Sequence, residues 1–302
     1  MTYPKVSIVV LNWNGLKDAI ECLESLKKIT YPNYEMIVVD NGSEGNDADV
    51  LEKRYKDYIK VIRNKNNLGW AGGVNKGIEY AIANGSNLLL ILNNDIVVGK
   101  NFLEPLVKDM LMDENIGIIG PANYCYYEPK KVFSSGQKIS YWKGKVIELN
   151  LLGDSKEVDT LAGCCLLIKK EVIDKIGYFY EPYFLNLEET DYCARAGKTG
   201  FKTVCEPKSK VWHKIGATLG KIPASATYYF YRNKLLFTKR NAPFYIKYPF
   251  YFYASLYLVF RFIEELIKRD KMMTFAIKRA LIDFWTGSFG KKNFIENIKK
   301  FK

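Results

Sequence analysis

Histidine, paired cysteines and long apolar runs are scarce in this sequence. Its 302 residues hold one histidine, His213, and its six cysteines form no CxxC pair, so the spacing of a structural zinc site is lacking. Neither GxGxxG nor a P-loop lysine signature occurs, which argues against a dinucleotide or P-loop site. In the C-terminal part the uncharged run 248–260 has 13 residues, fewer than the roughly 20 that span a bilayer.

The N-terminus carries no apolar core of a signal peptide. Met-Thr-Tyr-Pro-Lys leads straight into an apolar strand, and the unpaired cysteines are interpreted as reduced core residues. Together these features predict a cytoplasmic location. With 48% hydrophobic and 26% charged residues, the chain has the composition of a globular α/β protein with a sizeable core.

Positive charge is concentrated at one end of the chain. Residues 239–302 contain 14 Lys or Arg against 5 Asp or Glu, which accounts for +9 of the formal net charge of +12. Aromatic residues are interleaved with these charges, a pattern typical of helices that contact anionic lipid. A homodimer interface or a solvated helical face remains an alternative. No motif indicates nucleic-acid binding.

The stretch 88–98 predicts a buried strand that ends on a polar turn. Five apolar residues are followed directly by Asn93, Asn94 and Asp95. Because ligands of open α/β sheets lie beyond the carboxyl ends of the strands, Asp95 is a candidate ligand for a metal ion or charged substrate. A plain Asn-Asn-Asp turn is the alternative interpretation.

Two further strands place polar residues at the same edge of the predicted sheet. Strands at 6–11 and 34–39 flank a helix at 18–28, so this βαβ unit has parallel strands, which end at Asn12 and Asp40. A glycine-rich stretch, 66–77, leads into the next helix, which is expected at 74–83, and its backbone is expected to approach a ligand closely.

Eight segments, in this order, resemble the family 2 glycosyltransferases with a GT-A fold, especially the rhamnosyltransferase-like branch of surface polysaccharide synthesis. The resemblance covers about residues 5–240. It rests on the order of the segments, because no one of them is specific by itself. They are VSIVVLNWN (6–14), IVVDNGS (37–43), the loop 67–77, LNND (92–95), LAGCC (161–165), EETDYCAR (188–195), Gly200-Phe201 and Trp212-His213.

The resemblance implies a mixed, mainly parallel Rossmann-like sheet flanked by helices, with a C-terminal helical extension. The GT-A domain would span residues 1–240, with a nucleotide-sugar half at about 1–98 and an acceptor half at about 99–240. Residues 241–302 would form a basic, aromatic helical tail. We expect β-hairpins in the tyrosine-rich stretch after Pro121, where Trp142 either stacks on an acceptor sugar or packs in a hairpin core.

The donor implied by the resemblance is a nucleoside-diphosphate sugar. Asp40 would hydrogen-bond the base, and Asp95, the last acid of the family's DxD motif, would bind Mn²⁺ or Mg²⁺ together with His213. Asn93 stands where that motif has its first acid. Taken alone, a lone histidine is more often structural than a ligand. The remaining donor-binding candidates are Asn12, Asn67, Gly72, Asn75, Asn94 and Lys214, the last at the start of a loop expected to close over the diphosphate.

The catalytic candidates are Glu188 and Glu189. In the family an Asp after a Glu acts as general base, and Glu189 occupies that position here. Three acids within four residues also repel one another, which raises a pKa toward a useful value. An acidic helix start is the structural alternative. A strand is expected at 160–169, and the resemblance places its Gly163 beside the donor or acceptor. Asp191 and Arg195 are expected to form an i,i+4 ion pair.

These features predict an inverting, metal-dependent glycosyltransferase that moves a sugar from a UDP- or dTDP-sugar to a glycan or lipid-linked acceptor. The expected location is cytoplasmic, with possible peripheral attachment to the inner face of the plasma membrane. A catalytically silent nucleotide-sugar or glycan-binding protein, or a scaffold of a polysaccharide assembly complex, is the alternative. A nucleotidyltransferase is disfavoured, because the sequence lacks its glycine-rich, Arg-containing N-terminal loop.

Overall fold

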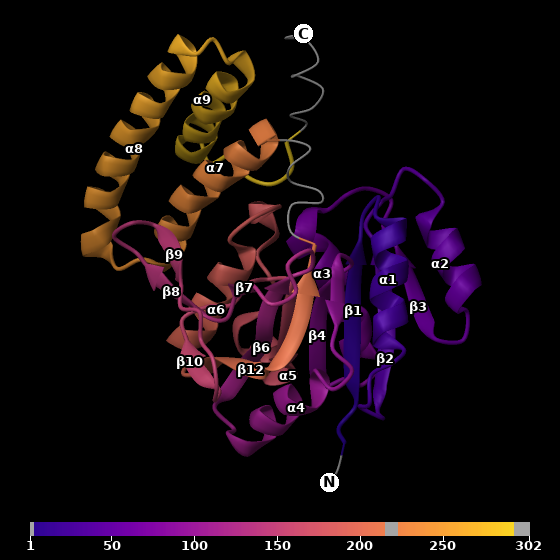
Figure 1. The fold of residues 1–302 in the computed structure, drawn as a ribbon. Coiled ribbons are helices and arrows are strands. Elements are labelled where there is room, and N and C mark those ends of the chain that lie inside the picture. Colours follow the sequence, from indigo (N-terminus) through magenta and orange to yellow (C-terminus); the bar gives the residue numbers. More distant parts are fainter. Residues whose placement is uncertain (1–2, 215–222, 293–302) are drawn as a thin grey trace.

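A mixed β-sheet with helices on both faces forms the centre of the molecule (Figure 1), and the computed structural model describes residues 3–214 and 223–292. The strand order is β10-β12-β6-β11-β4-β1-β2-β3, and the β4-β1-β2-β3 half is parallel. The strands are β1 Val6–Asn12, β2 Tyr34–Asp40, β3 Ile59–Arg63, β4 Leu88–Asn93, β5 Ile96–Val98, β6 Ile116–Cys125, β7 Val132–Ser134, β8 Gln137–Ser140, β9 Lys145–Glu148, β10 Lys156–Val158, β11 Cys165–Lys169 and β12 Lys202–His213. The predicted α/β class is confirmed.

Alternate residues of the central strands pack on opposite faces of the sheet. In β4, Leu88, Leu90 and Leu92 join the core under α1 and α4, whereas Leu89 and Ile91 join the core under α3, α5 and α6. A strand covered on both faces has no polar alternation, which explains the continuous apolar run. The helices of the described ranges are α1 Leu16–Leu26, α2 Asp47–Tyr55, α3 Gly69–Ala83, α4 Leu103–Met112, α5 Lys170–Ile176, a 3₁₀ turn η1 Glu181–Tyr183, α6 Glu188–Lys198, α7 Pro223–Asn241, α8 Phe244–Ile267 and α9 Lys271–Trp285.

The strand ends meet as the sequence predicts. In the register of the sheet Asn12 pairs with Asp40, and Leu11 pairs with Asn93. One predicted boundary was wrong: the strand expected from Thr160 begins only at Cys165. Cys165 lies opposite Leu92, near the end of β4, so residues 160–164 run past that end as a loop over the polar edge of the sheet.

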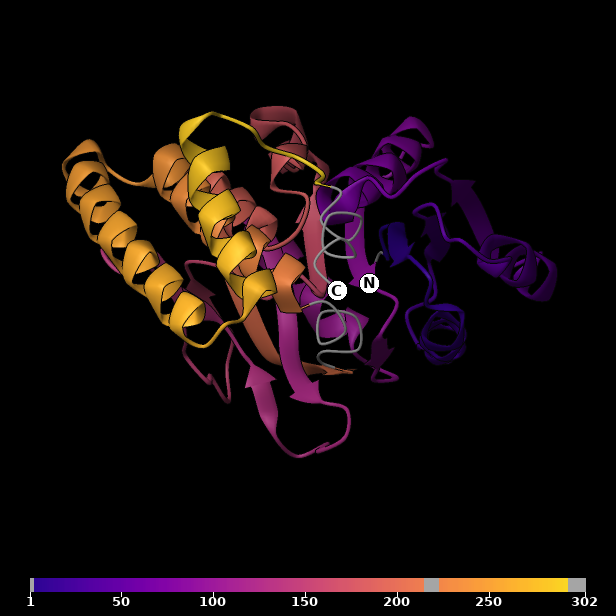
Figure 2. The same ribbon diagram turned by 90° about the horizontal axis from the view of Figure 1, so that it is seen from above.

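The predicted tail, residues 241–302, contains α8 and α9. These two helices pack with α7 around an apolar core, the tail core. Figure 2 shows α8 and α9 side by side at the end of the molecule opposite α1 and α2. Within residues 3–214 and 223–292, no helix is long and apolar enough to cross a membrane.

Close packing of α3 on the sheet gives a test of the fold. A Cβ at Gly77 would overlap the side chain of Val9, whereas a Cβ at Gly197 of α6 would meet nothing within 4 Å. We expect Gly77→Ala to lower the free energy of unfolding by about 1–3 kcal/mol through overpacking. Gly197→Ala should leave it unchanged or raise it by up to about 1 kcal/mol. Urea denaturation measures both, and equal effects would contradict this packing.

Candidate active site

A polar network joins the ends of β1, β2 and β4. Asn12 is fully buried, and its Nδ2 donates to Asp40 Oδ1 at 3.2 Å and to Asp47 Oδ2 at 3.0 Å. Its Oδ1 accepts from Asn94 Nδ2 at 2.7 Å, and Ser43 Oγ donates to Asp40 at 2.6 Å. Asn12 and Asn94 therefore hold the turns at this edge in place. Asp47, at the start of α2, belongs to the network although the sequence did not single it out.

The glycine-rich loop is tied to the same edge. Asn41 Nδ2 donates to Asn67 Oδ1 at 3.2 Å and to the Gly69 carbonyl at 2.9 Å. The helix that follows begins at Gly69, five residues before the predicted Val74, and Gly69 has a φ of +77°. A Cβ there would overlap Phe184, so glycine allows this loop to touch the segment that precedes α6.

Asp95 and His213 lie beside each other because β5 pairs antiparallel with β12. His213 is opposite Ile96 in that pairing, and its Nε2 is 3.3 Å from Asp95 Oδ2. Both side chains are about 15% exposed. Burial alone would lower the pKa of His213, but Cys164 and Asp95 outweigh burial and raise it above its ordinary value. The sequence separation of 118 residues is bridged entirely by the sheet.

The donor atoms at this pair fit a divalent cation. Asp95 Oδ1 and His213 Nδ1 are buried with no hydrogen-bond partner in the described residues. Such atoms carry a desolvation cost unless a ligand satisfies them. No group of three or more His, Cys, Asp or Glu side chains suited to a metal is present in the ranges 3–214 and 223–292. A cation at this pair would have two protein ligands and would need phosphate oxygens and water to complete its coordination.

Glu188 and Glu189 occupy the first turn of α6 but differ in environment. Glu188 is 4% exposed, and burial together with the charge of Glu189 raises its pKa to about 8. Its Oε2 has no hydrogen-bond partner in the described part of the chain. Glu189 is partly exposed, and burial raises its pKa. Burial thus disfavours the charged form of both carboxyl groups, and Glu189 is the one that lies beside the loop 160–164.

The loop 160–164 connects the two halves of the site. A Cβ at Gly163 would lie only 3.1 Å from Glu189 Cβ, so the absence of a side chain leaves room around this carboxylate. The next residue, Cys164, accepts the Asn93 N–H at 3.0 Å through its carbonyl, and its thiol donates to Asn123 Oδ1 at 3.1 Å. Cys164 also lies close enough to His213 to raise the pKa of that imidazole. Gly163 thus stands between the base candidate and the metal candidates, although sequence alone gave no geometry for it.

Asp191 fixes the position of α6. It is fully buried and accepts from Arg195 Nε at 2.8 Å, Arg240 Nε at 2.9 Å, Asn241 Nδ2 at 2.7 Å and Tyr183 Oη at 3.1 Å. Burial alone would raise its pKa, but the two arginines hold it below its ordinary value. The i,i+4 pair with Arg195 is present as predicted. The two ligands from the end of α7 were not foreseen.

The segment before α6 has unusual backbone geometry. Phe184, Asn186 and Leu187 have φ values of 65°, 71° and 70°, in the left-handed region that side chains other than glycine rarely adopt. Asn233 Nδ2 donates to the carbonyls of Leu185 and Asn186 at 2.6 and 2.9 Å. Buried Arg232 donates to the carbonyls of residues 182 and 183. The Arg-Asn pair in α7 is visible in the sequence, but nothing there indicates what it binds.

Several predicted donor contacts already have partners within the chain. Lys214 Nζ pairs with Asp18 and Glu21 at 2.7 and 2.6 Å. Asn75 binds the Phe179 backbone through both its side-chain atoms, at 3.0 and 3.1 Å. These contacts give both residues a positioning role. The loop expected to close over the diphosphate, residues 215–220, lies outside the described residues.

Two further candidates, Gly72 and Trp142, differ in their surroundings. A Cβ at Gly72 would lie 2.8 Å from Leu68 Cβ, so this glycine allows a tight first turn of α3. Trp142 is 61% exposed in the turn between β8 and β9, and it takes no place in a hairpin core.

The chain resembles curated glycosyltransferases over most of its length. It is 28% identical over 201 residues to the low-salt glycan biosynthesis hexosyltransferase Agl10 of Haloferax volcanii, covering 63% of this chain and 61% of that protein. It is 24% identical over 230 residues to an N-acetylglucosaminyl-diphospho-decaprenol L-rhamnosyltransferase of Mycobacterium tuberculosis, covering 67% of this chain and 74% of the relative.

Solved structures share the fold. A mannosyltransferase from Pyrobaculum calidifontis, in complex with GDP-Man and Mn²⁺, superimposes with a TM-score of 0.61 at 12% identity over 94% of this chain and 88% of its own. GalNAc-T7 with UDP, GalNAc and Mn²⁺ gives a TM-score of 0.60 at 18% identity, over 70% of this chain and 44% of its own. This likeness confirms the GT-A-like fold followed by C-terminal helices. The family described as "Glycosyl transferase family 2" matches residues 7–177, and the chain belongs to that family.

Proposed function

We propose that this protein is a metal-dependent, inverting glycosyltransferase that uses a nucleoside-diphosphate sugar. The observation that carries the proposal is the position of the loop 160–164, because Gly163 lies beside Glu189 and the next residue, Cys164, lies near His213. Displacing a diphosphate with a hydroxyl group requires a general base and a cation. Candidates for both lie beside this one short loop.

The donor is proposed to lie over the strand ends. The Asp40 carboxylate can accept the imide N–H of a pyrimidine, which supports a UDP- or dTDP-sugar. Asp95 and His213 would hold Mn²⁺ or Mg²⁺, and the bound cation would neutralise the charge that develops on the diphosphate leaving group. Two solved structures with the same fold contain Mn²⁺, which supports Mn²⁺ as the cation here. Asn12, Asn67 and Asn94 keep the surrounding turns in place.

Glu189 is proposed to take the proton from the acceptor hydroxyl. As that oxygen forms its bond to the anomeric carbon, the bond between this carbon and the diphosphate oxygen breaks, and the nucleoside diphosphate leaves. One displacement from the opposite face inverts the anomeric configuration. The partly exposed Glu189 suits this role, whereas Glu188 is enclosed and protonated at neutral pH.

The acceptor is proposed to be a glycan, either free or lipid-linked, in the synthesis of a surface polysaccharide or glycoprotein. The rhamnosyltransferase relative is named for a diphospho-decaprenol acceptor, which supports the lipid-linked form. A cytoplasmic location is part of the same proposal.

Replacing Asp95 tests the cation site. We expect Asp95→Ala to weaken Mn²⁺-dependent donor binding by about a hundredfold, since it removes a carboxylate ligand. His213→Ala should weaken binding more with Mn²⁺ than with Mg²⁺, because imidazole suits the softer ion. The measurement is isothermal titration with UDP- and dTDP-sugars, each with Mn²⁺, Mg²⁺ or EDTA.

Asp49→Ala is the matched control for Asp95→Ala. Asp49 is an exposed aspartate of α2 that pairs with Arg63, and its loss should leave donor binding unchanged. Equal binding by Asp95→Ala and the wild type would remove Asp95 as a ligand. If no donor binds the wild type with either metal, a scaffold role replaces the enzyme proposal.

Replacing each of the two glutamates by glutamine tests which of them is the base. Glu189→Gln should keep donor binding and reduce transfer roughly a hundredfold to ten-thousandfold, because an amide cannot take a proton. Glu188→Gln should reduce transfer less than about tenfold at neutral pH, since Glu188 is already uncharged there. Release of nucleoside diphosphate with a panel of glycosylated polyprenyl diphosphates measures transfer. Near-normal turnover by Glu189→Gln would overturn its assignment.

The pH dependence of transfer provides a separate test. A base is active when deprotonated, and burial raises the pKa of Glu189, so transfer should fall as pH decreases through that raised value. Above pH 8 the ionisation of Glu188 adds a second charge beside the base in the wild type but not in Glu188→Gln. We expect the single-turnover profiles of these two proteins to coincide below that pH and to separate above it. Separation only on the acid side would contradict the two assignments.

A further inference from the structure

The outer face of α8 is apolar, aromatic and uncharged. Helix α8 has 24 residues, so the face is about 36 Å long at the usual rise per residue. Ile246, Phe250, Ala254 and Leu258 bury the other side of α8 against the tail core. The exposed apolar side chains, between 39% and 76% accessible, are Phe244, Tyr245, Tyr248, Phe252, Tyr253, Leu256, Tyr257, Val259, Phe260, Ile263, Leu266 and Ile267.

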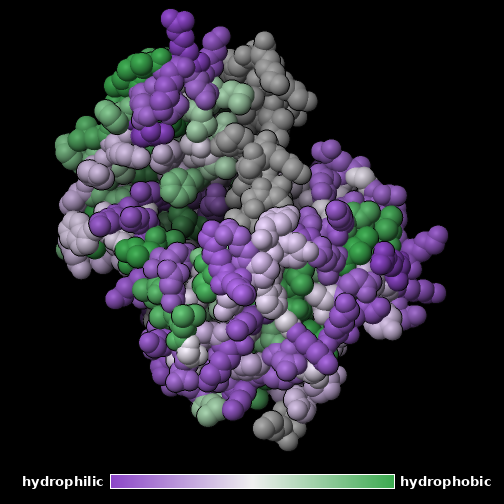
Figure 3. Space-filling view, in the orientation of Figure 1, coloured by the Kyte–Doolittle hydropathy of each residue, from purple (hydrophilic) through white to green (hydrophobic). Residues whose placement is uncertain are grey.

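The charged residues of α8 avoid this face. Arg261 is only partly exposed and pairs with Glu264 and with Glu265, which is itself buried. Lys247 is likewise only partly exposed. Figure 3 shows hydrophobic surface over the upper left of the molecule, where α8 and α9 lie. Contiguous apolar surface of this extent marks an interaction site in a protein that is otherwise well packed.

Basic residues surround the exposed face. Lys268, Arg269 and Lys271 are exposed directly after it, and Lys278 and Arg279 are exposed on α9. Arg279 pairs with Asp283, and Lys268 pairs with Glu264 and Glu265, but the segment 239–302 keeps a formal charge of +9. An apolar aromatic face with basic flanks is complementary to a bilayer that contains anionic lipid.

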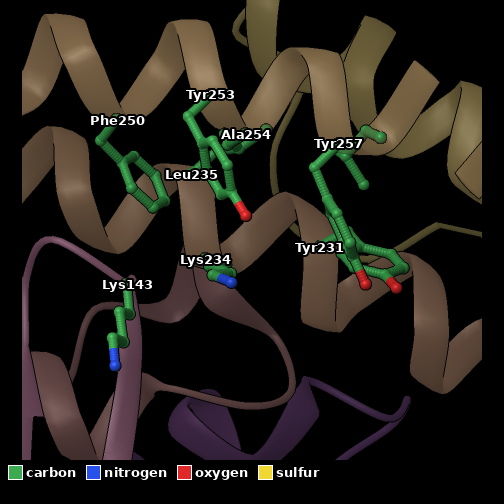
Figure 4. Close-up of a pocket in the computed structure, with 9 residues that line it drawn as sticks. Lys143, Tyr231, Lys234, Leu235, Phe250, Tyr253, Ala254 and Tyr257 are labelled. Carbon is green, nitrogen blue, oxygen red and sulfur yellow. The ribbon is translucent and has the colours of Figure 1, made fainter. Parts of the chain in front are cut away.

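A small hollow of about 20 Å³ adjoins this face, and two lysines line it (Figure 4). Lys143 comes from the β8–β9 turn and Lys234 from α7, while Tyr253 and Tyr257 of α8 line the hollow and also belong to the exposed face. The turn is packed tightly there, since a Cβ at Gly144 would lie 2.9 Å from Lys234 Cε.

The two lysines add positive charge beside the aromatic face. Neither Lys143 nor Lys234 has a salt-bridge partner among residues 3–214 and 223–292, and Lys234 is only partly exposed. No carboxylate lines the hollow. A lipid phosphate would meet both positive charges while its acyl chains lie along the aromatic face.

A second copy of the chain fits this face less well than a membrane does. Two tails that met through α8 would each bring a formal charge of +9 to one interface, and like charges repel across it. A bilayer with negative lipid gains from the same charge. We propose that α8 lies flat on an anionic membrane surface, with its aromatic face among the headgroups and a lipid phosphate held between Lys143 and Lys234.

Vesicle co-sedimentation of the full chain tests the proposal without reference to sugar transfer. The probes are vesicles of phosphatidylcholine alone and of equal parts phosphatidylcholine and phosphatidylglycerol. The wild type should bind the anionic vesicles, and Phe252→Ser, Phe260→Ser and Ile263→Ser combined should weaken partitioning by at least about tenfold. Lys143→Gln with Lys234→Gln should weaken partitioning to anionic vesicles by about fivefold for each lysine.

Matched controls distinguish binding through the α8 face from nonspecific hydrophobic or electrostatic binding elsewhere on the surface. Leu111→Ser, Met112→Ser and Tyr127→Ser remove three exposed apolar side chains on the sheet domain, and Lys28→Gln with Lys65→Gln removes two exposed charges there. Both control sets should bind vesicles like the wild type, and urea denaturation should confirm that every variant is folded.

Three results would overturn the proposal. If the apolar triple variant binds vesicles like the wild type, the α8 face is not the membrane-binding surface. If both lysine-pair variants lose the same amount of vesicle binding, Lys143 and Lys234 do not form a specific phosphate site. A wild-type dimer in sedimentation velocity that the α8 triple variant dissociates would assign the face to a second copy of the chain.

Discussion

The buried carboxylate of Asp191 is the contact on which the arrangement of this molecule depends. An uncompensated charge at a fully buried position would be strongly destabilising, so its partners must stay in place. Those partners come from α6, from η1 and from the last turn of α7. The site and the tail are thereby coupled, because the same helix turn that carries Glu189 is anchored by Arg240 and Asn241. A boundary at residue 240 passes through this anchor.

The same coupling explains how a strained segment persists before α6. Left-handed residues cost free energy, and they remain only where surrounding contacts over-determine the backbone. Asn233 and Arg232 supply those contacts from α7, and the glycine loop supplies another, because the Trp70 N–H donates to the Phe184 carbonyl at 2.9 Å. The strain fixes where α6 begins and hence where Glu189 lies relative to Gly163.

Much of the fold could be predicted because its determinants are local. The run 88–92 and the apolar strands 6–11 and 34–39 indicate buried strands by composition alone, and their polar ends meet because parallel strands share an edge. The limits appear where a partner lies far along the chain. Nothing near Thr160 indicates that β11 begins only at Cys165, opposite the end of β4. Nothing near Arg240 indicates that its carboxylate partner is Asp191, 49 residues away.

Asn93 illustrates how a contact of this kind changes the interpretation of a motif. Its Oδ1 accepts the indole N–H of Trp70 at 2.8 Å, and its backbone N–H donates to Cys164. A carboxylate would serve Trp70 equally well as an acceptor but would place a second negative charge near Asp95. The amide satisfies the indole without that charge. The first position of the motif is thus engaged in holding the glycine loop against the loop 160–164. In the proposed function, the cation would therefore be bound by Asp95 and His213, the only imidazole in the chain, and not by Asn93.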